Sequence, residues 1–243
     1  MSPLSHVIFE SNLLRIGRFC CQPDDPHFAN TGPIVSGHLI VFPRTSVCIT
    51  HAGGEPIIAD PNVVMFYNQY QHYQRAPLSE RGDLCEWFAF APGVLIEALS
   101  TFDPAATEQP DHPFRFTHGP SDAASYIQQR TVIEQILNDA PSTPLYIEET
   151  MLQVLSNVMA QVQRVRGSTR RKTAPNTAHS HRALTFAVRE ILSKEFHKPI
   201  TLTQLAAAVH CSPFQLCRLF QRHTGVPIHR YLNQLRLRTA LEA

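Results

Sequence analysis

The sequence lacks long apolar runs. No stretch of its 243 residues reaches the roughly 18 consecutive apolar residues that a membrane-spanning helix requires. The first ten residues, MSPLSHVIFE, contain no basic segment followed by an apolar stretch, so we expect no signal peptide. These two absences predict a protein that has no membrane partner.

The sequence also lacks a disulfide framework. Small secreted domains that depend on disulfides carry closely spaced cysteines, because the bridges replace a hydrophobic core. Here the cysteines are spread over the whole chain, at Cys20, Cys21, Cys48, Cys85, Cys211 and Cys217. We therefore expect reduced thiols and a cytoplasmic location.

Motifs that carry catalytic chemistry are missing as well. The sequence shows no paired acid and base, no nucleophile motif and no glycine-rich loop that would cradle a phosphate. His210, Cys211, Cys217 and His223 do not have the spacing of known zinc sites. We expect no catalytic residues, no bound metal and no cofactor.

Charge is divided unevenly along the chain. Residues 1–160 contain 7 Lys/Arg and 17 Asp/Glu, which gives a net charge of −10, whereas residues 161–243 contain 14 Lys/Arg and 3 Asp/Glu, which gives +11. A basic C-terminal part is expected when one half of a protein meets phosphates and the other does not. A solvated basic tail is the alternative, but the charge lies on a segment with regular helical patterning.

From about Leu13 to Phe90 the apolar runs are short and rich in β-branched and aromatic residues, with Pro, Gly, Asn and Asp between them. This rhythm is typical of a β-sandwich or barrel. The period then changes, and Ser121–Asp139 and Pro144–Arg166 both have the spacing of amphipathic helices. A turn-rich cluster separates them, so we expect an antiparallel helix pair.

Residues 201–223 have the pattern of two short helices joined by a tight turn. Thr201 with Gln204 has the spacing of a capping box, and Ser212 with Gln215 repeats this start signal. Leu216, Leu219, Phe220 and His223 fall on one face of the second helix. Two separately capped helices in this arrangement predict a helix-turn-helix.

The opposite face of the second helix carries Phe214, Cys217, Arg218 and Gln221, with Arg222 beside them. Arginine pairs with a guanine edge and glutamine with an adenine edge, so the face suits the major groove of DNA. An ordinary solvated helix is the alternative that we weigh against it. The candidate DNA-binding residues are Ser212, Phe214, Gln215, Cys217, Arg218, Gln221 and Arg222.

Residues 182–243 resemble the DNA-binding module of AraC/XylS-type transcription regulators. The residues in register are Leu205, Ala206, Ser212, Pro213, Leu216, Arg218, Phe220, Gly225, Tyr231, Arg236 and Ala240. His210 stands where the family usually has glycine, so we expect it in the left-handed backbone region. The family module has two helix-turn-helix units joined by a long helix, and only the first is expected within this sequence.

The resemblance implies an α+β chain in which a cupin-like β-barrel precedes a helical pair and an all-α helix-turn-helix module. We expect a sensing domain over 1–120, a helical pair over 121–166, a linker over 167–181 and the DNA-binding module over 182–243. The implied partners are double-stranded DNA, a small-molecule effector, a second copy of the chain through the helical pair, and RNA polymerase. The helical pair simply covering the barrel is the alternative to its dimer role.

The expected function is a transcription regulator that couples an effector to sequence-specific DNA binding. The alternative is a shortened, dimerising ligand-binding protein without DNA binding of its own. A metal-dependent cupin enzyme is disfavoured, because such enzymes carry a His-x-His pair and a Glu in the barrel. The only such pair here is His179 and His181, outside the barrel region.

Overall fold

The β domain consists of two antiparallel sheets. A computed structural model describes residues 4–169 and 175–242. The first sheet has six strands in the order β1-β2-β9-β4-β7-β10, and the second has four in the order β3-β8-β5-β6. The strands are β1 (Ser5–Glu10), β2 (Leu14–Cys21), β3 (Asn30–Thr31), β4 (Leu39–Pro43), β5 (Val47–His51), β6 (Pro56–Ala59), β7 (Val63–Tyr67), β8 (Tyr73–Pro77), β9 (Asp83–Phe90) and β10 (His118–Pro120).

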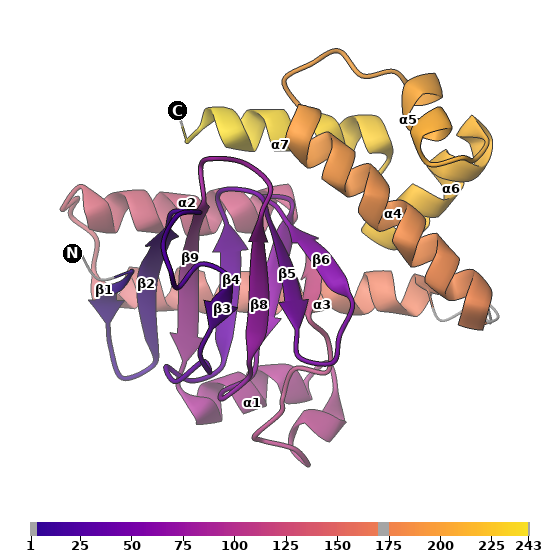
Figure 1. The fold of residues 1–243 in the computed structure, drawn as a ribbon. Helices are drawn as coiled ribbons and strands as arrows, with labels where there is room; N and C mark the ends of the chain where they lie inside the picture. Colours follow the sequence, from indigo (N-terminus) through magenta and orange to yellow (C-terminus); the bar gives the residue numbers. More distant parts are fainter. Residues whose placement is uncertain (1–3, 170–174, 243) are drawn as a thin grey trace.

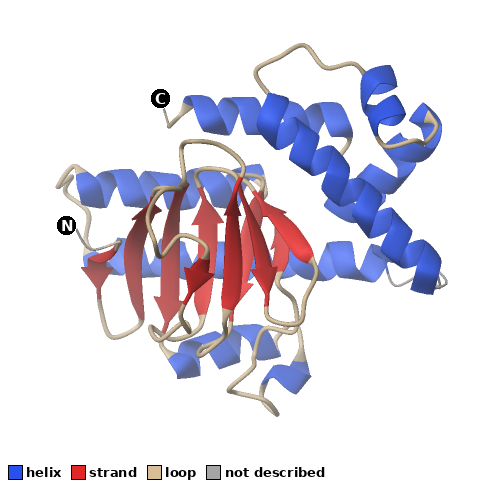
Figure 2. Ribbon diagram, viewed as in Figure 1, coloured by secondary structure: helices blue, strands red, loops and turns tan. Residues whose placement is uncertain are grey.

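Helices follow the strands, so the expected α+β architecture is confirmed (Figures 1 and 2). The helices are α1 (Pro92–Ser100), the 3₁₀ turn η1 (Pro104–Ala106), α2 (Ala123–Leu137), α3 (Pro144–Thr169), α4 (Pro175–Glu195), α5 (Leu202–Ala208), α6 (Pro213–Thr224) and α7 (Ile228–Ala240). None of the described helices is both long enough and apolar enough to cross a lipid bilayer.

The central strands are apolar on both faces, because each face of the six-stranded sheet is covered. Every residue of β4 and β7 is buried. One face packs against the second sheet, where Val41 and Trp87 meet Ile49. The other face packs against α2 and α3, which lie behind the sheet in Figure 1. The β domain and the helical pair therefore share one continuous core.

Strand β10 and helix α3 approach each other unusually closely. A Cβ atom at Gly119 would lie 2.3 Å from the Cγ2 atom of Val162, far inside the contact distance of real carbon atoms. Only a residue without a side chain fits there. The helical pair is thus fixed against the edge of the sheet at β10.

The linker expected over 167–181 is shorter than predicted. Residues 167–169 are the last residues of α3, and 175–181 form the start of α4; residues 170–174 lie outside the described residues. Proline suits the first position of a helix, and a helix that is already packed extends at little cost because each added residue brings one hydrogen bond. The polar composition of 175–181 predicted a linker there, whereas α4 already begins at Pro175.

The four C-terminal helices form a separate small core. Leu205 of α5 and Leu216 and Phe220 of α6 are buried against Val188 of α4 and Leu235 of α7. In Figure 1 this module lies beside the end of the sandwich, with α7 running across the edge of the sheets. The fold thus consists of two units with their own cores.

Candidate nucleic-acid interface

Helix α5 begins with the capping box that its sequence predicts. The Thr201 Oγ1 atom accepts a hydrogen bond from the Gln204 backbone N–H at 3.2 Å, and the Thr201 N–H donates to Gln204 Oε1 at 2.9 Å. Leu205 and Ala206 are buried, as expected from the spacing. The first helix of the motif is therefore fixed by local chemistry at its start and by packing along one face.

Helix α6 has both of its ends defined by the residues that predict them. The Ser212 Oγ atom accepts from the Gln215 N–H at 3.2 Å, and Pro213 occupies the first turn. Gly225 closes the helix in the left-handed region at φ +79°. His210, in the turn before α6, has φ +51°, which confirms the strained position expected where the family has glycine.

The two faces of α6 differ sharply. Leu216, Leu219 and Phe220 are buried, and the Phe220 ring lies edge-on to Tyr231 with 5.2 Å between centroids. His223, which was expected on this face, is only half-buried. The inward face of α6 therefore packs into the core of the module, and its last turn, at His223, is partly exposed.

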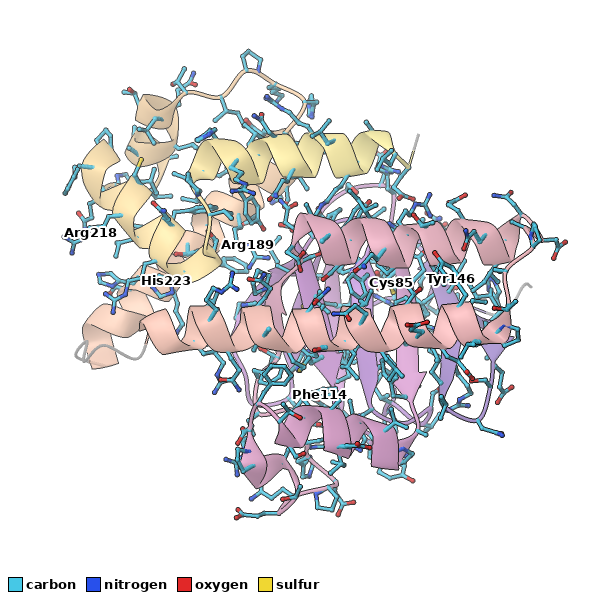
Figure 3. All side chains as sticks on the ribbon, turned by 180° about the vertical axis from the view of Figure 1, so that it is seen from behind. Cys85, Phe114, Tyr146, Arg189, Arg218 and His223 are labelled. Atoms are coloured by element: carbon cyan, nitrogen blue, oxygen red, sulfur yellow. The ribbon has the colours of Figure 1, made fainter. Side chains whose placement is uncertain are left out.

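The predicted DNA-binding residues lie on the outward face or at the helix start. Ser212, Phe214, Gln215, Cys217, Arg218 and Gln221 are exposed, and Arg222 is half-buried. The exposed fraction of Phe214 is 77%, high for a large apolar ring. Figure 3 places Arg218 at the outer margin of the molecule, far from the sheets. The hydroxyl of Ser212 is engaged in the helix cap, so it serves the fold as well as the surface.

Replacing Thr201 with alanine should destabilise the module by about 1 kcal/mol, because the cap of α5 is lost. Thr203, exposed in the first turn of the same helix, is the matched control. Thr203→Ala should change the unfolding free energy by less than about 0.5 kcal/mol. Urea denaturation of both variants measures the difference; equal effects would contradict the capping role.

Helix α7 is docked onto the β domain through buried polar contacts that the sequence did not reveal. The Tyr231 hydroxyl donates to Asp60 Oδ2 at 2.5 Å, and Asn62 Nδ2 donates to the Tyr231 carbonyl oxygen at 2.9 Å. Arg238 donates to the carbonyl oxygens of Pro61 at 2.7 Å and Ser121 at 3.0 Å. Burial raises the pKa of Tyr231 well above its ordinary value, so the phenol stays protonated and remains a donor.

Arg189 of α4 joins the same junction. Its Nε atom donates to the Tyr231 hydroxyl at 2.9 Å, its Nη2 atom donates to the Ile58 carbonyl oxygen, and the guanidinium is paired with Asp60 at 3.7 Å. Figure 3 shows Arg189 between the module and the sheets. Arg189 is buried, so these contacts are largely shielded from solvent.

A cavity of about 720 Å³ opens beside this junction. Strands β6 and β10 and helix α3 supply one wall, and helices α4, α6 and α7 supply the other. Within the ranges 4–169 and 175–242, no group of three or more His, Cys, Asp or Glu side chains is placed to hold a metal ion. The candidate sites are therefore a groove-reading helix and a junction cavity.

Comparisons with known proteins agree with the geometry of the module. Residues 192–233, which run from the end of α4 into α7, match the family of bacterial regulatory helix-turn-helix proteins, AraC family. This segment is therefore a helix-turn-helix of the kind found in DNA-binding bacterial regulators. The match to the AraC family confirms the resemblance for these residues. No curated protein matches the chain.

Several solved structures are similar to the whole chain at low sequence identity. Apo ToxT from Vibrio cholerae strain SCE256, a single-residue variant, has a TM-score of 0.47 and 10% identity, with 93% of this chain and 99% of that chain covered. Wild-type ToxT from the same strain, bound to an unsaturated fatty acid, has a TM-score of 0.43 and 10% identity, with 92% of this chain and 96% of that chain covered. The AraC-like transcriptional activator CuxR has a TM-score of 0.35 and 11% identity, with 94% of this chain and 77% of that chain covered. At these TM-scores the likeness carries no weight for function.

Proposed function

We propose that this regulator reads a specific DNA sequence with the outward face of α6 and that its β domain senses a small-molecule effector. The observation that carries the first part is the separation of faces on α6. Leu216 and Phe220 are buried in the module, whereas Arg218 and Gln221 are exposed on the opposite side. A helix with this division can enter the major groove without disturbing its own core.

The chemistry of the exposed side chains suits base recognition. Arg218 can donate two hydrogen bonds to a guanine edge, and Gln215 or Gln221 can pair with adenine. The exposed ring of Phe214, in the first turn, can pack against a thymine methyl group. Arg222 and the start of the helix at Ser212 are placed for phosphate contacts, which position the protein without reading sequence.

The junction supports the coupling part of the proposal. Asp60, Pro61 and Asn62 follow β6, in the β domain, and each contacts a helix of the module. An effector that alters this loop changes the free energy of docking and hence how α6 is presented to DNA. The helical pair 121–166 is our proposed contact with a second copy, since Ile127 and Leu145 leave large apolar side chains exposed.

Arg218→Ala should weaken binding to the preferred DNA site by about 1–3 kcal/mol and relax base preference at one position. The unfolding free energy should stay within about 0.5 kcal/mol, because Arg218 is exposed. The preferred site is first selected from a random library of duplexes, and binding is then measured with each single-base variant of that site.

Arg115→Ala, an exposed arginine in the β domain, is the matched control and should leave both affinity and preference unchanged. If Arg218→Ala lowers affinity equally for all sequences, Arg218 contacts phosphate and does not read a base. If Arg218→Ala unfolds the module, the assignment of the two faces of α6 is wrong.

A further inference from the structure

A second cavity, which we call the inter-sheet cavity, lies inside the β domain and has a volume of about 190 Å³. Strands of both sheets line it, with Val41 and Trp87 on one side and Ile49 on the other. Protein interiors are packed as densely as organic crystals and hold few voids larger than a water molecule. The side chains around a larger void lose van der Waals contacts on the side that faces it. A cavity of this size is therefore a candidate binding site within the core.

The size of the inter-sheet cavity suits a molecule with a single ring. An apolar cavity of roughly 150 Å³, engineered into another protein, binds benzene. The inter-sheet cavity, at about 190 Å³, has room for one ring and one or two small substituents. A two-ring molecule or a long hydrocarbon chain is too large for it.

Aromatic side chains form much of the wall. The rings of Tyr67 and Tyr73 lie 4.9 Å apart between centroids, and Phe19 and Trp87 also line the cavity. Aromatic rings attract each other in edge-to-face and offset arrangements beyond the gain from buried area. An aromatic ligand therefore makes contacts here that a saturated ring of the same size does not.

The charge at the wall is already neutralised. Among the described lining residues, Asp83 is the charged one, and its Oδ2 atom accepts a hydrogen bond from Arg75 Nη1 at 2.5 Å. The Arg75 guanidinium in turn lies over the Phe19 ring, 4.8 Å from its centroid. A charged ligand would lose its hydration in the cavity without meeting an unpaired charge of opposite sign. The ligand is therefore uncharged.

The Tyr67 hydroxyl supplies a polar anchor. It makes no hydrogen bond within the part of the chain that the structure describes. Burial raises the pKa of Tyr67 well above its ordinary value, and Tyr73, Asp83 and Cys85 raise it further. These three neighbours all line the cavity, which places the hydroxyl beside it. The phenol keeps its proton, so a hydroxyl group on a ligand can pair with it.

A loop closes the cavity on one side. Ile34, Val35 and Ser36, between β3 and β4, line it, and Val35 is 69% exposed on the outside. The loop is held by the Tyr70 N–H, which donates to the Ile34 carbonyl oxygen at 2.7 Å, and by Arg15, which donates to the Ser36 carbonyl oxygen. A ligand can enter by displacing this loop, without breaking the hydrogen bonds between strands.

We propose that the inter-sheet cavity binds an uncharged molecule with one aromatic ring and one hydroxyl group. The ring packs against Phe19, Tyr73 and Trp87, and the hydroxyl pairs with Tyr67. The closing of the loop 34–36 over the ligand excludes water from this contact.

The cavity is connected to the junction through one strand end. Ala59, the last residue of β6, lines the cavity, and the next residue is Asp60, whose carboxylate accepts from the Tyr231 hydroxyl. Occupancy of the cavity is therefore transmitted to a loop that docks the module. Binding follows from the cavity alone, whereas this effect on the module rests on the proposed function.

Titration calorimetry of the full chain with p-cresol tests the ligand class. Benzoate, which has the same ring with a charge, should bind at least about tenfold more weakly. 4-Methylcyclohexanol, the saturated counterpart of p-cresol, should bind several-fold more weakly, and 2-naphthol should not bind. Equal affinity for benzoate, or absence of p-cresol binding, would overturn the proposal. Equal affinity for 2-naphthol would overturn the assigned size.

Tyr67→Phe tests the anchor. It should weaken p-cresol binding about three- to tenfold and leave the binding of toluene, which lacks the hydroxyl, unchanged. Equal weakening for both ligands would mean that Tyr67 contributes only packing.

Ala59→Leu locates the site. The added methyl groups should occupy the cavity and weaken p-cresol binding at least about tenfold, while the urea midpoint of the β domain stays the same or rises. Ala89→Leu is the matched control, because Ala89 is buried in the same core but does not line the cavity. It should lower the midpoint by overpacking. An equally lowered midpoint in Ala59→Leu would mean that no open space exists there, and unchanged p-cresol binding would place the ligand elsewhere.

The selected duplex separates this inference from the proposed function. Specific DNA binding is measured with the ligand-free chain and with the chain saturated with p-cresol. Binding of p-cresol without a change in DNA affinity would refute the coupling in the proposed function and leave the cavity assignment standing. Specific DNA binding without p-cresol binding would overturn the cavity assignment and leave the reading of DNA by α6 standing.

Discussion

Replacing Phe220 with alanine is expected to unfold the C-terminal module. The Phe220 ring is fully buried in α6 and packs edge-on against Tyr231 in the small core of four helices. Truncation of a buried phenylalanine costs about 3–5 kcal/mol, because the transfer free energy is lost and a cavity remains. Small domains have only about 5–15 kcal/mol of stability in total. Urea denaturation followed by far-UV circular dichroism measures the loss.

Phe214 offers a matched control on the same helix. Its ring is 77% exposed, so Phe214→Ala should change the unfolding free energy by less than about 0.5 kcal/mol. Both variants should bind the selected DNA site less well, Phe220→Ala because the module is unfolded and Phe214→Ala because a surface contact is lost. Equal destabilisation by the two substitutions would contradict the orientation of α6.

Arg44→Met is expected to destabilise the β domain by about 3–5 kcal/mol, because it leaves the Glu86 carboxylate buried without its main partner. Both side chains are fully buried, and Arg44 donates to Glu86 and, at 3.1 Å, to the Tyr126 hydroxyl. Arg44 also lies 3.4 Å from the carboxylate of Glu242, just beyond α7. Methionine keeps an apolar stem but lacks the guanidinium group, so the charge and the hydrogen bonds to Glu86 and Tyr126 are removed.

The loss in Arg44→Met should depend on pH. Burial raises the pKa of Glu86 in the folded protein, and Arg44 opposes this shift. Without Arg44, the pKa of Glu86 in the folded protein should rise further above its value in the unfolded chain. The folded state then binds a proton more tightly than the unfolded state does, so the free energy of unfolding increases as the pH falls. The deficit relative to the natural protein should therefore shrink as the pH is lowered from neutral toward the ordinary pKa of a glutamate.

Arg18→Met is the control for this second substitution. Arg18 lies 3.5 Å from the same carboxylate, but its side chain is 27% exposed. Solvent screening limits the expected loss to less than about 1 kcal/mol. A deficit in Arg44→Met that stays constant over the pH range would mean that the uncompensated charge is not its cause.

The helix-turn-helix could be predicted in detail from the sequence because its determinants are local. The caps at Thr201 and Ser212 act within three residues, and the spacing of Leu216, Leu219 and Phe220 defines a face without reference to the rest of the chain. The outward-facing residues follow from the same spacing. Their contact with DNA stays a prediction, because the exposure of a side chain does not identify the molecule that it binds.

The junction could not be predicted, because its contacts join residues that are far apart in sequence. Asn62 and Tyr231 are separated by 169 positions, and Arg189 meets Ile58 across 131. Arg189 and Arg238 look like ordinary surface arginines in their helices, and no spacing rule marks them as buried. The cavity depends on the same docking, so no pattern in the sequence indicates it.

The position of α6 has an electrostatic consequence. The β domain and helical pair contain all 17 acidic residues of 1–160, whereas residues 161–243 carry a net charge of +11. Figure 3 shows Arg218 on the side of the module that faces away from the sheets. This division of charge gives the molecule an electric dipole, and α6 belongs to the basic unit. In the field of a DNA duplex such a dipole experiences a torque that turns the basic unit toward the phosphates before contact.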